Sequence, residues 1–290
     1  INSLQLITSL ALIVIGMMVA AFIGGAPVDG VRPELAIAAP WYESAWREKG
    51  ALVIFPFLFI TIACGAISGF HCLVSSGTSS KQLRNEPDAR FVGYGGMLLE
   101  GFLATLVILA CVAGLSLGID GKLGTEAWDA RYASWDVVKQ GAIGSFVFGA
   151  ANFLKALGLS AAVATAIMAV LVASFAGTTL DTACRLQRYV IQELAATLRA
   201  PKAEGGSDWG FLKCFENKHV ATLTAVSAAI FLAAVPNEGA WTWANIGTGG
   251  LILWPLFGAT NQLLAGLAFL VITFYLWRRG RAVWFLVIPM

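Results

Sequence analysis

Long apolar runs, separated by short polar segments, follow one another along almost the whole chain. A helix that crosses a bilayer needs roughly 20 mostly apolar residues. Six runs approach or exceed that length, and a seventh begins at Ala282. The six predicted spans are Leu4–Ile23, Ala51–Val74, Val92–Leu117, Ser160–Cys184, Val220–Val235 and Ile252–Trp277. The pattern therefore predicts an all-α polytopic membrane protein, a bundle of about six to seven transmembrane helices.

One apolar segment, Gly141–Leu157, does not fit this series because it is short and is interrupted by Asn152 and Lys155. We predict that it forms a helix on the outer side of the membrane instead of crossing it. If it does cross, the orientation of every span before it is inverted.

Lysine and arginine predict the orientation, because cytoplasmic loops are enriched in them. The segment after Cys184 is basic and is predicted to be cytoplasmic, whereas the turn Pro236–Trp241 has no basic residue and is predicted to be outside. The remaining positions predicted inside are Lys81, Arg84, Arg90, Arg278, Arg279 and Arg281. Asp29–Lys49 then falls outside, and one orientation satisfies all of these segments.

The composition supports a membrane protein, since 12% of residues are charged against about a quarter in soluble domains. The net charge of +2 is too small to imply a nucleic-acid partner. Five cysteines show no metal-ligand spacing, so we expect free thiols, no metal and no other cofactor. We expect one transmembrane domain over 1–290, with a cytoplasmic loop at 185–218, and a longer parent protein whose N-terminal part is missing.

The stretch from Gly65 to Gln82 places glycines, serines and a histidine where an apolar span should still be in lipid. Irregular backbone at membrane depth is tolerated where it is packed in protein or lines a cavity. In transporters such broken helices present backbone groups to substrates and ions. The alternative is close helix packing through small residues, with the histidine satisfied in a core. The candidate substrate-binding residues are Gly65, Ser68, Gly69, His71, Ser75 and Ser76.

Two further places carry polar groups inside predicted spans, and each such group is a functional candidate. Thr178, Thr179 and Asp181 offer oxygen ligands of the kind that a hard cation such as Na⁺ needs, although Asp181 can instead pair with Arg185. Glu100 lies about two turns inside its span, where a protonatable carboxylate suits proton coupling or a polar neighbour on another helix. Weaker signals are Asn152, Asn245, Thr248, Asn261 and Gln262. Pro255 predicts a kink in the last long span.

An enzymatic function is not indicated. Ser68 and His71 lie three residues apart on one segment, without the G-x-S-x-G elbow that exposes a nucleophilic serine. A serine hydrolase also needs its base held by packing, usually from another element. The protein is therefore predicted not to be an enzyme.

The blocks FPFLFITIACGAISGFHCLVSSGTSSKQL, SFAGTTLDTACRLQRYVIQEL, NFLKALG and WPLFGATNQLLAGLAFL resemble the carbon starvation protein A family. The resemblance covers nearly all of the chain, with Cys72 standing where a small residue is expected. It implies a bacterial or archaeal inner-membrane transporter with the inverted-repeat fold of amino acid–polyamine–organocation transporters. It also implies peptide uptake during carbon starvation, or pyruvate uptake with protons.

A second likeness concerns ion coupling. FAGTT is similar to the FAG-x-T stretch of sodium-coupled amino-acid transporters, where hydroxyls bind Na⁺. The likeness points to Thr178 and Thr179, while Leu180 stands where a second hydroxyl is expected. By the same likeness, the chain is the C-terminal part of the fold and the segment near 65–78 is its unwound helix. Gly141–Leu157 would then be an external re-entrant helix.

The sequence thus predicts an importer of peptides or small carboxylates such as pyruvate, coupled to H⁺ or Na⁺. Its expected partners are the small-molecule substrate, the lipid bilayer and the remaining N-terminal part of the same protein. One alternative is a transporter-like nutrient sensor that signals to a cytoplasmic partner through Arg185–Lys218 without net transport. Another is a passive channel, which would show flux without ion-driven accumulation.

Overall fold

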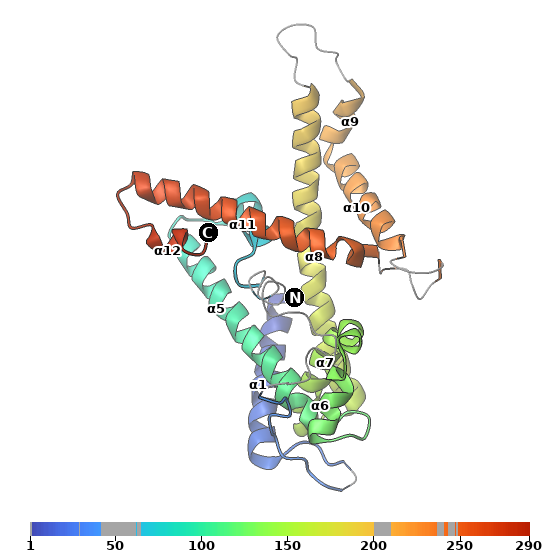
Figure 1. The fold of residues 1–290 in the computed structure, drawn as a ribbon. Coiled ribbons are helices and arrows are strands. Elements are labelled where there is room, and N and C mark those ends of the chain that lie inside the picture. Colours follow the sequence, from blue (N-terminus) through green and yellow to red (C-terminus); the bar gives the residue numbers. More distant parts are fainter. Residues whose placement is uncertain are drawn as a thin grey trace. The chain divides into compact units, whose positions relative to one another are not determined.

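The computed structural model describes residues 2–28, 30–41, 62, 65–199, 210–236, 241–242, 247 and 249–290. The chain divides into two compact units. The first comprises Ile1–Leu52 and Asn85–Thr178, and the second comprises Val53–Arg84 and Thr179–Met290. Within the described residues, four helical stretches are long and apolar enough to cross a membrane: Ser3–Ile23, Asp88–Leu117, Ala161–Arg199 and Leu256–Arg278 (Figure 1). The chain is an all-α polytopic membrane protein, as predicted.

Three predicted spans lie within a few residues of their helices. These are α1 (Asn2–Ile23), α10 (Lys218–Ala234) and α11 (Trp254–Arg278). The second predicted span lies outside the described residues up to Gly65, apart from Ile62. The apolar run that begins at Ala282 forms only the four-residue helix α12 (Trp284–Val287).

The predicted kink at Pro255 is wrong. A short 3₁₀ helix, η6 (Gly249–Leu253), precedes α11, and Pro255 stands in the first turn of α11. A proline is tolerated there because its missing N–H is one that the helix would leave without an intrahelical partner anyway. Pro255 therefore begins the helix instead of bending it.

Helix α8 (Ala161–Arg199) is longer than predicted. The prediction ended this span at Cys184, where basic residues appear, but the helix continues to Arg199 because the sequence from Arg185 to Ala200 contains no glycine or proline. At 39 residues the helix is about 58 Å long, roughly twice the thickness of the hydrocarbon core. Part of the segment predicted as a loop is thus a helical extension of a span.

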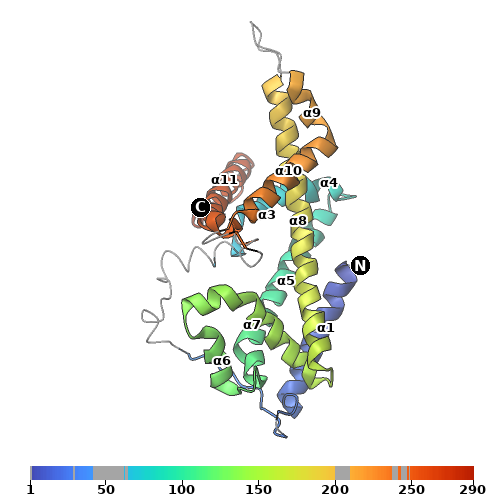
Figure 2. The same ribbon diagram turned by 90° about the vertical axis from the view of Figure 1, so that its right-hand side faces the viewer.

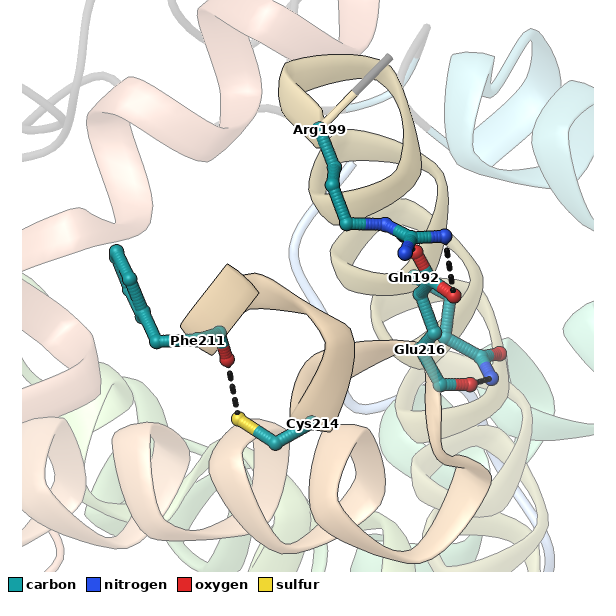
Figure 3. Close-up of polar contacts among 5 residues, drawn as sticks. All are labelled: Gln192, Arg199, Phe211, Cys214 and Glu216. Atoms are coloured by element: carbon teal, nitrogen blue, oxygen red, sulfur yellow. Dashed lines mark hydrogen bonds and ion pairs between the residues drawn. The ribbon is translucent and has the colours of Figure 1, made fainter. Parts of the chain in front are cut away.

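The end of α8 is held by α9 (Lys213–Glu216), as Figures 2 and 3 show. Arg199 Nε lies 2.8 Å from Glu216 Oε1, and Gln192 Nε2 donates to the Glu216 backbone carbonyl at 2.6 Å. One acidic residue therefore ties α9 to α8 through both its side chain and its backbone.

The core of the first unit is built around α7 (Trp135–Ala156), which begins six residues earlier than the predicted start at Gly141 because Ser134 caps it. The helix packs against α1 and against a continuous helical stretch made of α5 (Asp88–Leu109), the π-helix η3 (Ala110–Gly114) and the 3₁₀ helix η4 (Leu115–Leu117). A Cβ on Gly149 would overlap the backbone of Ala110, and one on Gly114 would overlap the backbone of Gly149. Glycine is required at both positions because the two backbones touch.

The π-helix η3 is buried and its free backbone groups find partners elsewhere in the first unit. A π-helical turn widens the helix and breaks the regular hydrogen-bond ladder. The Val112 carbonyl accepts from the Ala38 N–H at 2.8 Å. Asn152, 4% exposed, donates its Nδ2 to the carbonyls of Gly114 and Gly118 at 2.9 Å each. Asn152 Oδ1 in turn accepts from Lys155 Nζ at 2.7 Å, and burial lowers the pKa of this lysine.

Candidate functional site

The segment predicted to be a broken helix is interrupted at Ile67 and Ser68. Residues on either side are helical, but Ser68 has an extended backbone, with φ −94° and ψ 122°. From Ser68 the chain enters α3 (Gly69–Val74), continues through the π-helix η2 (Ser75–Ser79) and ends in α4 (Ser80–Gln82). Ser68 is the N-cap of α3, and its Oγ accepts from the His71 N–H at 3.4 Å. The segment thus has two irregular points within fifteen residues, counted from Ser68 to Gln82.

A second side chain holds the same break from α11. Asn261 Oδ1 accepts from the Phe70 N–H at 2.6 Å and from the Ser68 hydroxyl at 3.2 Å. Asn261 is 2% exposed, so these bonds are shielded from water and are not easily exchanged for bonds to solvent. The amide oxygen therefore fixes the start of α3 against α11.

Gly69 allows this approach. A Cβ at Gly69 would overlap the Asn261 carbonyl oxygen, the Leu264 Cβ and the Ala265 backbone nitrogen. Gly69 is buried, whereas a Cβ at Gly65 would meet no atom within 4 Å. The close packing that the sequence offered as an alternative is thus present at Gly69 but not at Gly65.

The hydroxyl groups near η2 bond to their own helix. Ser75 Oγ and Ser76 Oγ both donate to the Cys72 carbonyl at 2.9 Å, and Ser80 Oγ donates to the Ser76 carbonyl at 2.7 Å. These serines replace ladder bonds that the π-helical turn weakens. Ser75 and Ser76 are exposed, and their oxygens keep a lone pair for a further donor.

His71 lies one turn after the break. It is exposed, and its side chain makes no hydrogen bond with the residues that the structure describes. Its ring lies 6.1 Å from that of Phe70, measured between centroids. His71 is therefore not a satisfied core histidine in this part of the chain.

The candidate ion-coupling residues on α8 are exposed. Thr178 Oγ1 donates to the Ser174 carbonyl at 3.0 Å. Asp181 pairs with Arg185, with Arg185 Nη2 3.0 Å and Nε 3.1 Å from Asp181 Oδ2. The ion pair that the sequence left open for Asp181 is thus formed, and Thr179 lies beside these residues on the same helix.

Glu100 stands in the middle of α5, in the first unit, and is exposed. Its carboxylate makes no ion pair with any described residue. The structure brings Ser68 and Gly69 together with Asn261 in the second unit, and it describes Glu100 within the first unit only.

Asn261 had only a weak signal in the sequence. A polar residue in an apolar run indicates an interhelical hydrogen bond in general, but the sequence does not identify the partner, which lies 193 positions away. The usable signal was that Asn261 lies near glycines in one span while Ser68 and Gly69 lie near the break in another.

The sequence of the chain matches the family described as "Carbon starvation protein CstA" over residues 6–127 and 112–290. The chain belongs to the carbon starvation protein CstA family.

Among curated relatives of this family, the "Peptide transporter CstA" of Helicobacter pylori is 33% identical over 94% of this chain and 42% of the relative. The "Peptide transporter CstA" of Escherichia coli is 30% identical over 81% of this chain and 37% of the relative. The "Pyruvate/proton symporter BtsT" of Escherichia coli is 68% identical over 62 residues, which is 21% of this chain and 8% of that protein. The chain spans less than half the length of these relatives. No solved structure matches it.

Proposed function

We propose that the chain forms part of a secondary active transporter that imports peptides or small carboxylates such as pyruvate across the bacterial or archaeal inner membrane, coupled to H⁺ or Na⁺, during carbon starvation. The observation that carries the proposal is the helix break at Ser68, which the buried Asn261 holds against a membrane-spanning helix. A break with fixed backbone and exposed polar side chains next to it is how secondary transporters build a substrate site. The names of the relatives support the same class of protein.

Ser68, Gly69 and His71 are the substrate-binding residues that we place first. His71 is the one with an exposed ring that makes no hydrogen bond to the described chain, and it can donate to a carboxylate. Ser75 and Ser76 give their hydroxyl protons to Cys72, so they offer acceptors to a substrate ammonium or amide. Gly65 lines the same segment without steric restriction.

We assign coupling to Glu100, Thr178, Thr179 and Asp181. A carboxylate without a cation partner among the described residues suits proton uptake, and this describes Glu100. Asp181 already has Arg185 as its counter-ion, so an incoming cation must compete with a guanidinium for it. Proton coupling through Glu100 is therefore favoured over Na⁺ at Asp181.

The deciding experiment is uptake into vesicles by the intact natural protein, with a pH gradient and a Na⁺ gradient imposed separately and with labelled pyruvate or a dipeptide. Accumulation with one gradient identifies the class, the ion and the substrate together. Flux without accumulation indicates a channel. Binding without flux indicates a sensor, for which the α8 extension held by Arg199 and Glu216 offers an ordered surface.

Site variants test the residues in the same assay. We expect His71→Ala to abolish uptake without reducing the amount of folded protein, because the side chain makes no hydrogen bond to the described chain. The matched control is Gly266→Ala on α11, where a Cβ meets nothing within 4 Å. We expect Glu100→Gln to abolish proton-driven accumulation while exchange of substrate continues. An unchanged pH dependence in that variant would remove Glu100 from the mechanism.

A further inference from the structure

Two cations meet one aromatic ring where the broken segment reaches α8, within the second unit. Lys81 Nζ lies 5.3 Å from the centroid of the Tyr189 ring, and the guanidinium carbon of Arg188 lies 4.8 Å from the same centroid. Lys81 belongs to α4 and the other two residues to α8. The ring therefore holds together two positive charges that would otherwise repel each other.

The contact between the two segments is independently visible at Gly77. A Cβ at this position would lie 2.9 Å from Leu186 Cδ2. Leu186 and Tyr189 lie on the same face of α8, since they are three residues apart. The end of the broken segment is thus packed on α8, and the two cations are not brought together by side-chain flexibility alone.

Neither cation has a carboxylate partner among the described residues. The arginines elsewhere show the contrast, because Arg185 pairs with Asp181 and Arg199 pairs with Glu216. Arg188 Nε is buried and lacks a hydrogen-bond acceptor in the described chain, and so is the Thr78 hydroxyl, one turn before Lys81. Buried donors without acceptors are unfavourable and call for an anionic or polar ligand.

The cluster lies where two apolar runs end. Asp181 is the first charged residue on α8, and Arg188 follows it by seven residues, which is about 10 Å along a helix. The headgroup region extends roughly 5–8 Å beyond the hydrocarbon core, and long arginine and lysine side chains reach back toward it. Tyrosine is also enriched at this depth.

We infer that Lys81, Arg188 and Tyr189 form a binding site for the phosphate of one anionic phospholipid. The charges supply the attraction, the unsatisfied Nε–H supplies a directed hydrogen bond, and Leu186 supplies apolar surface for the start of an acyl chain. A phospholipid is preferred to a soluble anion because the cluster lies at the membrane surface. The inference does not rest on transport.

The test is lipid binding by the intact natural protein, measured by native mass spectrometry and by the rise in melting temperature with phosphatidylglycerol against phosphatidylcholine. The variant is Lys81→Gln with Arg188→Gln. Each basic residue near an anionic surface contributes about fivefold in affinity, so we expect binding of phosphatidylglycerol to weaken about 25-fold. The control is Arg278→Gln with Arg281→Gln, which removes two charges from another basic cluster and should leave binding nearly unchanged.

Three outcomes overturn the inference. An equal loss in the control pair would mean general attraction to the surface. Retained binding in the Lys81 and Arg188 variant would mean that the cluster is not the site. The same thermal shift with glycerol phosphate in the absence of lipid would mean a soluble anion. If the double variant does not fold, the exposed Lys81→Gln alone should weaken binding about fivefold, and the exchange of Lys81→Arg with Arg188→Lys should retain it.

Discussion

The two π-helical turns of this chain, η3 in the first unit and η2 in the second, have opposite surroundings. In η3, Ala110, Ala113 and Gly114 are buried, whereas no residue of η2 is buried. The sequence of η3 (ACVAG) has no hydroxyl group, while that of η2 (SSGTS) has four. The freed backbone groups of η3 must therefore be satisfied by the rest of the unit, and those of η2 by its own side chains and their neighbours.

A buried asparagine stands at each irregular helix, and the two use opposite ends of the amide. Asn152 donates to carbonyls at the end of one helix, and Asn261 accepts from donors at the start of another. Asn152 lies among touching backbones, but Asn261 lies next to a segment whose side chains are largely exposed. An interrupted helix can thus serve close packing in one unit and access to polar groups in the other.

The largest effect that would break the comparison is expected at Gly149. Gly149→Val places its side chain in the backbone of Ala110, so we expect a loss of stability of about 3 kcal/mol or more. Gly144→Val on the same helix is the control, since a Cβ there meets only Phe148, at 3.8 Å and beyond. The measurement is the melting temperature of the detergent-solubilised protein by fluorescence-detected size exclusion. Equal melting temperatures would contradict the close contact at η3.

The next effect is expected for Asn152→Leu. It leaves the Gly114 and Gly118 carbonyls and the Lys155 ammonium without their partner, which should cost about 2–4 kcal/mol of stability. Uptake per folded molecule should change little, because this asparagine serves packing. The same melting assay, combined with uptake normalised to folded protein, separates the two readouts. A variant that melts normally but fails to transport would reverse the roles that we give to the two units.

Asn261→Leu sharpens the comparison from the other side. We expect a smaller loss of stability, about 1–3 kcal/mol, but complete loss of uptake, because the start of α3 is no longer fixed. A double-mutant cycle with Ser68→Ala measures the coupling between the two side chains. If the effects of Ser68→Ala and Asn261→Ala on uptake simply add, the hydrogen bond between them does not organise the site.

Much of this architecture could be predicted from the sequence. Helices α1, α10 and α11 follow from apolar runs, and the break near Ser68 follows from glycine and serine within such a run. The end of α8 was wrong because charge marks where a helix leaves the membrane, not where it stops. The kink at Pro255 was wrong because proline is harmless in a first turn. The partners of Asn152 and Asn261 could not be found, since each depends on contacts between distant segments.

The smallest effect is expected at Lys155, where burial holds the pKa below its ordinary value of 10.5. The folded state disfavours the protonated lysine, so its cost is present at neutral pH and disappears as the pH rises toward 10.5. We expect the melting temperature of the wild type to gain slightly relative to Lys155→Met as the pH rises through this range. A difference that does not change with pH would mean that the ammonium is fully solvated.

The wide turn of η2 also sets a rotation. Each residue of an α-helix turns the chain by about 100°, and a π-helical turn contains one residue more than an α-helical turn. Gly69 before the turn packs on α11, and Gly77 and Lys81, within and after it, pack on α8. Deleting a single residue between Ser75 and Ser79 would leave the first contact in place and swing Lys81 away from Tyr189. The aim of one end of this helix relative to the other is encoded by a count of residues, and can be changed without altering either binding face.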